Sequence, residues 1–82
     1  MKLIEWTMKA LRQAKKIKDS KIRAEIYDAV DSLKDFPDCR NIKKLVGRGE
    51  YRLRVGNYRV IFTESLTIIR IEEVKKRDEH TY

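Results

Sequence analysis

Three arginines lie at alternating positions within residues 51–62, at Arg52, Arg54 and Arg59. Gly56-Asn57 divides this stretch into two strand-like runs and favours a two-residue hairpin turn, because glycine takes the positive φ that such a turn needs. That turn sets Arg54 opposite Arg59 and brings all three guanidinium groups to one sheet face. Like charges directly opposite each other destabilise a sheet by roughly a few tenths of a kcal/mol. We therefore expect this face to bind an anion, and phosphate suits the guanidinium fork best.

The opposite face of the same hairpin is apolar. Because side chains alternate along a strand, its members are expected to pack on a core; they are Tyr51, Leu53, Val55, Tyr58, Val60 and Phe62. In the alternative interpretation the arginine face is an ordinary solvated surface, with Glu64 or Glu72 as ion-pair partners.

The residues before the hairpin are expected to form one strand and two helices that pack against it. Residues 2–6 read as a short strand, and Thr7 can cap the helix that follows with its hydroxyl group. A second helix is expected from the break at Asp19-Ser20 to Phe36-Pro37, where proline disfavours helical geometry in the preceding residue. Each helix carries one apolar stripe at helical spacing, as in an αα-hairpin.

The remaining segments complete an α+β fold of order β-α-α-β-β-β in a single domain, residues 1–82. Residues 38–50 are expected to form a polar connection with a local apolar anchor. A further strand covers residues 66–74, and the face that Arg70 joins is left open. The N-terminal strand and two-helix hairpin are followed by a three-stranded antiparallel meander, with both helices on one sheet face and the arginine face uncovered.

Composition limits the function classes. Twenty Lys+Arg against thirteen Asp+Glu give a net charge of +7, which favours polyanionic partners such as nucleic acid, or an acidic protein. No apolar run reaches the ~18 residues needed to cross a bilayer, so no membrane partner is expected. The single Cys39 has no Cys or His partners at metal-ligand spacing. We expect an inert thiol, no metal, no cofactor and a cytoplasmic location.

The hairpin and its flanks resemble the RelE/ParE superfamily of toxins from type II toxin-antitoxin systems. The likeness includes residues 42–47 (IKKLVG) before the hairpin, residues 74–77 (VKKR) after the last strand, the early residues 6–11 (WTMKAL) and the terminal Tyr82. It implies a cognate antitoxin that wraps an extended, acidic segment around the toxin. The superfamily holds ribosome-dependent mRNA endonucleases, which are RelE-like or HigB-like, and ParE-like gyrase poisons on one scaffold.

We favour the RelE branch, in which the RNA 2′-OH attacks the adjacent phosphate within the ribosome and translation stops. The resemblance then implies a catalytic set of Arg52, Arg54, Arg59, Arg77 and Tyr82. The first three would neutralise the phosphate, Arg77 would assist the leaving group, and Tyr82 would stack on a base or take the 2′-OH proton. His80 is a secondary candidate for the base. Arginines stand where well-known members carry lysines, which favours electrostatic roles over proton transfer.

The basic side of the first helix is a candidate surface for RNA, because exposed cations track a phosphate backbone. Its members are Lys9, Arg12, Lys15 and Lys16. Two other functions stay open. The first is a ParE-like inhibitor of DNA gyrase, and the second is a non-toxic basic interaction module that keeps only the scaffold.

Overall fold

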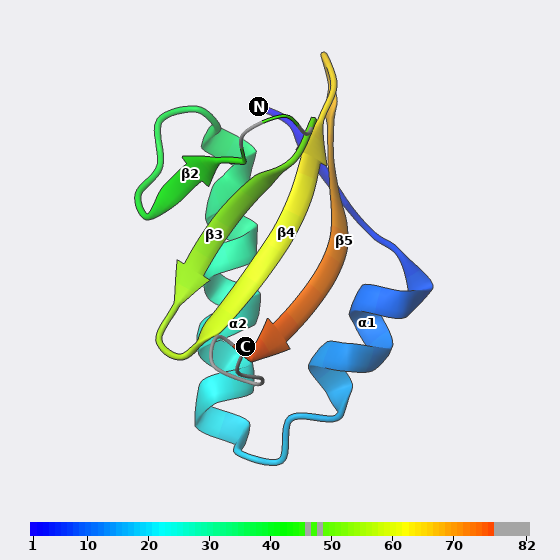
Figure 1. Ribbon diagram of the computed structural model, residues 1–82, viewed down its shortest axis with the longest axis vertical. Helices are drawn as coiled ribbons and strands as arrows, with labels where there is room; N and C mark the ends of the chain where they lie inside the picture. Colours follow the sequence, from blue (N-terminus) through cyan, green and yellow to red (C-terminus); the bar gives the residue numbers. More distant parts are fainter. Residues whose placement is uncertain (46, 48, 77–82) are drawn as a thin grey trace.

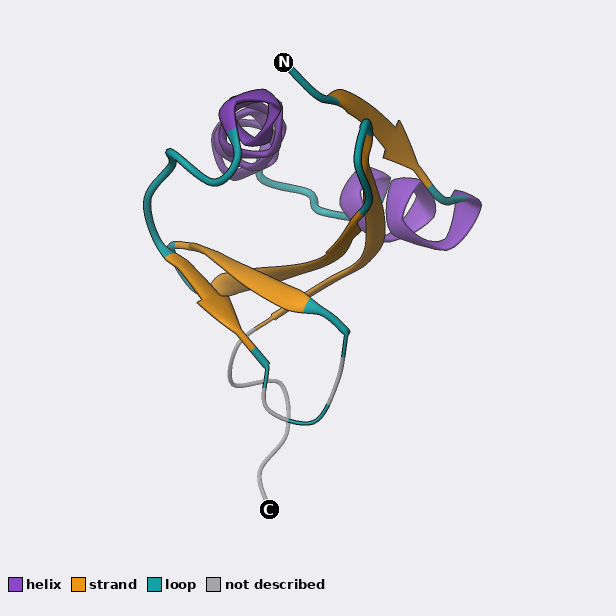
Figure 2. Ribbon diagram, turned by 90° about the horizontal axis from the view of Figure 1, so that it is seen from above, coloured by secondary structure: helices purple, strands orange, loops and turns teal. Residues whose placement is uncertain are grey.

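A five-stranded sheet carries two helices on one of its faces, as Figures 1 and 2 show. The computed structural model describes residues 1–45, 47 and 49–76. Sheet order is β1-β5-β4-β3-β2. The elements in chain order are β1 (Leu3–Trp6), α1 (Met8–Lys15), α2 (Ser20–Asp31), the 3-10 helix η1 (Ser32–Asp35), β2 (Ile42–Lys44), β3 (Tyr51–Val55), β4 (Tyr58–Glu64) and β5 (Ile68–Lys76). Neither helix in the described residues is long and apolar enough to cross a membrane.

The predicted hairpin is confirmed in register. In β3 and β4, Val55 pairs with Tyr58 and Arg54 pairs with Arg59 across the Gly56-Asn57 turn. Gly56 has a φ of 58°, which is the left-handed conformation that glycine adopts at low cost. The turn therefore fixes which residues of the hairpin face the helices and which face away.

The sheet is wider than the predicted meander, and it is mixed. Four strands follow the helices instead of three, because β2 pairs antiparallel with β3 inside the segment expected to be a polar connection. Three residues are too few to show the alternation by which a strand is found in a sequence. At the other edge β1 lies parallel to β5, a contact between distant segments that no local pattern predicts.

Element ends also differ from the expected ones. The last strand runs over Ile68–Lys76 instead of residues 66–74, because Ser65 closes a turn by bonding to the backbone of Ile68. The second helix stops at Asp31 and tightens into η1 before Pro37 is reached. Both predicted helix caps are present: the Thr7 hydroxyl accepts from the Ala10 N–H, and the Asp19 carboxylate accepts from the Lys21 and Ile22 N–H groups.

The core lies between the helices and the sheet. Its fully buried large side chains come from both layers and are Phe62, Ile26, Leu33, Ile69, Ile71, Val30 and Val60. The apolar side of the hairpin joins this cluster as predicted, either buried or packed against it. Trp6 of β1 packs edge-on against Tyr27 of α2, with ring centroids 5.5 Å apart.

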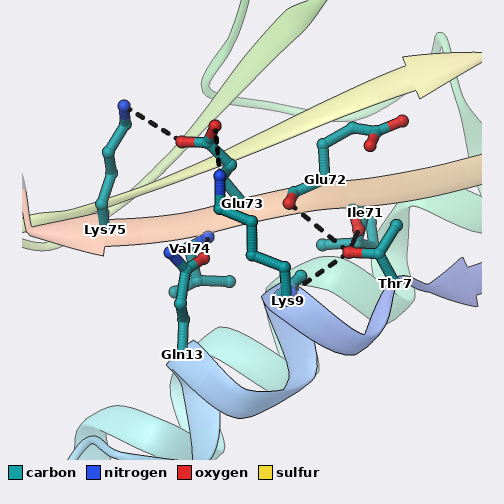
Figure 3. Close-up of polar contacts among 9 residues, drawn as sticks. Thr7, Lys9, Gln13, Ile71, Glu72, Glu73, Val74 and Lys75 are labelled. Atoms are coloured by element: carbon teal, nitrogen blue, oxygen red, sulfur yellow. Dashed lines mark hydrogen bonds and ion pairs between the residues drawn. The ribbon is translucent and has the colours of Figure 1, made fainter.

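Beyond the end of β1, the side chains of Thr7, which caps α1, and of Gln13 in α1 bond to the backbone of β5. The Thr7 hydroxyl donates to the Ile71 carbonyl oxygen at 2.8 Å (Figure 3). Further along, the Gln13 side-chain oxygen accepts from the Val74 N–H at 2.7 Å. Because an unpaired strand edge leaves backbone groups without partners, these two contacts fix α1 against β5.

Substitution of Thr7 tests this anchor. Thr7→Ala removes both the helix cap and the bond to Ile71, so the free energy of unfolding should fall by about 1–2 kcal/mol. Urea unfolding followed by circular dichroism measures it. Thr67→Ala is the matched control, because that threonine is exposed and only its carbonyl oxygen bonds to Leu3. Equal losses in the two variants would contradict the anchor.

Candidate phosphate-binding surface

A row of three cations crosses the sheet on the face away from the helices. Arg54 pairs with Arg59, and Arg59 pairs in turn with Lys75, so the row passes from β3 through β4 to β5. Neighbouring strands lie about 4.8 Å apart, so the row is about 10 Å long at the backbone. We call Arg54, Arg59 and Lys75 the cation row.

The next rung of the sheet adds two more cations. Lys43 of β2 pairs with Arg52 of β3, and Arg52 pairs with Ile61 of β4. Ile61 is 7% exposed although it lies outside the main core cluster, so this rung has an apolar centre. Arg52 and Arg59 are half-buried, whereas Arg54 and Lys75 are exposed. The predicted convergence of Arg52, Arg54 and Arg59 on one sheet face is therefore confirmed.

The carboxylates proposed as partners in the solvated-surface interpretation have other contacts. Glu64 pairs with Lys2, with 3.2 Å between Nζ and Oε2. Glu72 accepts a hydrogen bond from the Thr63 hydroxyl at 3.1 Å, and its Oε2 lies 3.9 Å from Arg70 Nε. Arg70 pairs with Thr63, which places it on the same face as the cation row but at the other end of β4.

Glu73 lies beside the cation row, because it precedes Lys75 by two residues in β5 and pairs with Ile61. Its two oxygens lie 3.1 Å from Lys75 Nζ and 3.2 Å from Lys9 Nζ (Figure 3). The hydrogen bond from Lys75 lowers the pKa of the Glu73 carboxyl, desolvation opposes this, and the bond from Lys9 lowers the pKa further. One carboxylate thus joins the basic side of α1 to the cation row.

The four basic residues proposed on α1 and at its end are all exposed, and two of them lie near β5. Lys9 pairs with Glu73. Lys16 lines a pocket of about 420 Å³ with Lys75 and Lys76, at the end of β5. Arg12 and Lys15 lie in the last turn of α1, where cations also favour the helix dipole.

Sequence reasoning missed Lys43, Lys75 and Glu73. A β-bulge explains the last two: β5 carries an extra residue opposite Ile61/Phe62, so alternation counted from Arg70 changes phase there. Simple alternation would place residues 72, 74 and 76 beside Arg70, whereas Glu73 and Lys75 pair with Ile61 and Arg59. Lys43 was missed because its strand was not predicted.

Three predicted site residues belong to the C-terminal segment. Arg77, His80 and Tyr82 lie outside the described residues, so their proposed roles remain predictions. Burial raises the pKa of the Cys39 thiol, and the nearby Asp35 and Asp38 raise it further. A raised thiol pKa disfavours the reactive thiolate, in keeping with the inert cysteine expected from the sequence.

The family model described as the ParE toxin of type II toxin-antitoxin systems, parDE, matches residues 4–80, and the chain belongs to this family. It is thus a type II toxin with the fold shared by RelE and YoeB proteins. No curated protein sequence shows a significant match.

Solved structures support the same assignment. The RelE-RelB complex from Pyrococcus horikoshii OT3 is 23% identical with a TM-score of 0.79, over 96% of this chain and 98% of that one. The RelBE2 complex from Mycobacterium tuberculosis is 25% identical with a TM-score of 0.80, over 93% and 98%. The YoeB dimer from Staphylococcus aureus is 20% identical with a TM-score of 0.74, over 99% and 98%.

The cation row should be unfavourable for stability. Arg54→Thr removes a like-charge cross-strand pair and introduces a good strand former, so the free energy of unfolding should stay constant or rise by a few tenths of a kcal/mol, roughly. Urea unfolding at 0.1 M and 1 M salt measures it, and the gain should shrink at high salt because the Debye length falls from about 10 to 3 Å.

Arg70→Thr is the matched control for that experiment. It makes the same change on the same sheet face, but at a position beside Glu72, where a cation is attracted instead of repelled. It should therefore leave stability unchanged or lower it slightly. A loss above about 1 kcal/mol in Arg54→Thr would indicate that Arg54 is held by an intramolecular ion pair and would contradict an anion-binding role.

The Glu73 contacts predict a pH-dependent contribution to stability. Because the pKa of Glu73 is lowered in the folded state, its contribution is complete above the ordinary glutamate pKa of about 4.3 and is lost as pH falls through the folded-state pKa. The difference in unfolding free energy between the native chain and Glu73→Gln should therefore be constant from pH 5 to 7 and vanish in acid. A difference that is independent of pH would exclude these ion pairs.

Proposed function

We propose that this toxin is a ribosome-dependent mRNA endoribonuclease that stops translation by cutting the message. The observation that carries the proposal is the cation row, with Arg54 directly opposite Arg59 and Lys75 next to it. A cluster of like charges on the sheet face away from the helices serves no purpose in packing. It suits a ligand whose negative charge grows during a reaction, as the charge of a phosphodiester does during cleavage.

The reaction expected for this site is attack of the ribose 2′-OH on the adjacent phosphorus. The P–O5′ bond breaks, leaving a 2′,3′-cyclic phosphate and a 5′-hydroxyl end. Arg52, Arg54 and Arg59 would hold the phosphate oxygens and stabilise the extra negative charge of the transition state. The face needs no metal for this role, because the guanidinium groups themselves supply the positive charge.

Proton transfer is assigned to residues of the C-terminal segment. Arginine stays protonated at neutral pH, so the sheet residues act through charge and not as acid or base. By resemblance to the family, Arg77 would stabilise the leaving 5′-oxygen, which takes its proton from water to become the 5′-hydroxyl, and Tyr82 or His80 would take the 2′-OH proton. These three assignments are carried by family likeness alone.

Two macromolecular partners follow from this proposal. The solved complexes of P. horikoshii RelE with RelB and of M. tuberculosis RelBE2 contain an antitoxin, and we propose that a cognate antitoxin binds this chain too. A net charge of +7 suits an acidic antitoxin segment. Ribosomal RNA would contact the exposed cations of Arg12, Lys15 and Lys16, which gain affinity through counterion release, and Lys9 would contact RNA beside the sheet.

Gyrase inhibition is the second candidate, favoured by one observation. The matching family model is named for the ParE toxin of parDE. A gyrase inhibitor acts by binding a protein and has no need of clustered cations around one phosphate, whereas the described solved relatives are RelE and YoeB proteins. A non-toxic interaction module is the third candidate, and harmless overexpression of the intact chain would support it.

A reconstituted translation reaction tests the proposed nuclease. Primer extension on the translated message should show cuts within codons and 5′-hydroxyl ends, only when ribosomes are translating. Arg59→Ala should slow cutting by about 10²-fold or more, as loss of one transition-state donor does elsewhere. Lys21→Ala removes the same charge from an exposed position at the start of α2 and should leave the rate unchanged.

Two results would overturn the nuclease proposal. One is an intact message during full growth arrest, above all with accumulated gyrase-DNA cleavage complexes, which would favour the ParE-like function. The other is equal cutting by Arg59→Ala and the native chain, provided that circular dichroism shows both to be folded.

A further inference from the structure

The cation row does not end at the arginines. Lys75 continues the row onto β5, which is the strand that α1 lies against. The row is about 10 Å long at the backbone, which is more than one phosphate group can span with its four oxygens. The proposed reaction needs cations around a single phosphate only. Lys75 therefore lies where a neighbouring phosphate of the same RNA would pass.

The anchoring of α1 against β5 brings a second cation, Lys9, close to Lys75. Thr7 and Gln13 bond to the backbone of β5 on either side of Lys9 in the sequence, so the helix is fixed against the strand. The Lys9 ammonium then extends over the β5 edge to Glu73 (Figure 3). Lys9 and Lys75 come from elements far apart in the chain, yet they meet at one carboxylate.

The Glu73 carboxylate contacts both ammonium groups, one through each of its oxygens. One carboxylate oxygen lies 3.1 Å from Lys75 Nζ, and the other lies 3.2 Å from Lys9 Nζ. A phosphodiester offers the same chemistry, with two oxygens that share one negative charge. The Glu73 side chain is 29% exposed and those of Lys9 and Lys75 are 62% and 51% exposed, so an external anion has access to all three.

We propose that Lys75 and Lys9 form a second phosphate-binding subsite, for the RNA phosphate next to the one held by Arg54 and Arg59. This inference rests on the proposed function, because it extends the same RNA path from the sheet onto α1. In the free protein the Glu73 carboxylate occupies the subsite and keeps the two ammonium groups together. When RNA binds, a backbone phosphate replaces the carboxylate between them.

Exchange of this kind is energetically accessible. Ion pairs at such exposure contribute little to stability, so release of Glu73 costs the fold little. RNA gains affinity through the counterions that leave its backbone when lysines bind it. A buried pair would not exchange in this way, because its desolvated carboxylate would be left uncompensated.

Equilibrium binding of the full chain to RNA tests the subsite. The probe is a fluorescein-labelled single-stranded RNA of ten nucleotides with 2′-O-methyl riboses, which cannot be cleaved, and the readout is anisotropy at several salt concentrations. Glu73→Gln frees both lysines and should tighten binding about fivefold, the effect of one nearby charge in water. Lys9→Met keeps helix propensity and should make the salt slope shallower by about 0.7, the value for one contact to single-stranded RNA.

A charge control separates a site from a general charge effect, and a double variant tests whether the gain depends on Lys9. Glu73→Gln with Lys9→Met should lose most of the gain seen for Glu73→Gln alone. Asp31→Asn removes a carboxylate that pairs with Lys34 at 3.1 Å on the helical layer, and should change affinity less than twofold. Equal gains for Asp31→Asn and Glu73→Gln, or a double variant that keeps the full gain, would overturn the subsite.

The outcome also distinguishes this inference from the proposed function. If the Glu73 and Lys9 variants behave as expected but translated mRNA stays intact, the nuclease proposal fails while the RNA subsite stands. If mRNA is cut and the variants bind RNA as the native chain does, the subsite alone fails.

Discussion

The pairing of Arg54 with Arg59 across a two-residue turn positions the charges of the candidate site. It is unfavourable by itself, since two guanidinium groups face each other across neighbouring strands. The hairpin keeps this register because a slip by one residue would move Leu53, Val60 and the other core-facing residues to the solvent side. Hydrophobic burial on one face therefore holds the charges in place on the other, where a phosphate would relieve their repulsion.

The helical layer contributes more than a cover for the core. Because β1 ends at Trp6 while β5 continues to Lys76, the second half of the β5 edge has no neighbouring strand among the residues that the structure describes. Side chains of α1 supply the partners instead, through Thr7 and Gln13, and so position the basic helix beside the cation row. Glu73 then connects the two sets of cations. The same anchoring that stabilises the fold brings Lys9 of α1 and Lys75 of β5 to one carboxylate.

The hairpin, both helix starts and part of the candidate site could be predicted from the sequence. The hairpin register follows from Gly56-Asn57 and strict alternation, and the helix starts follow from the hydroxyl of Thr7 and the carboxylate of Asp19. The parallel contact of β1 with β5 was not predictable, because its partners are more than sixty residues apart. The site was found in part: alternation revealed the arginines, whereas the bulge in β5 hid Glu73 and Lys75 by reversing the faces after it.

Side-chain NMR of the arginines measures whether one phosphodiester binds on the cation row. A non-cleavable dinucleotide with a single phosphate is titrated into labelled protein, and the Nε–Hε signals are followed. The account predicts that the signals of Arg54 and Arg59 shift together and saturate at one equivalent, while that of Arg70, at the far end of the same face, stays in place. Shifts spread evenly over all arginines, or confined to Arg12 on α1, would contradict it.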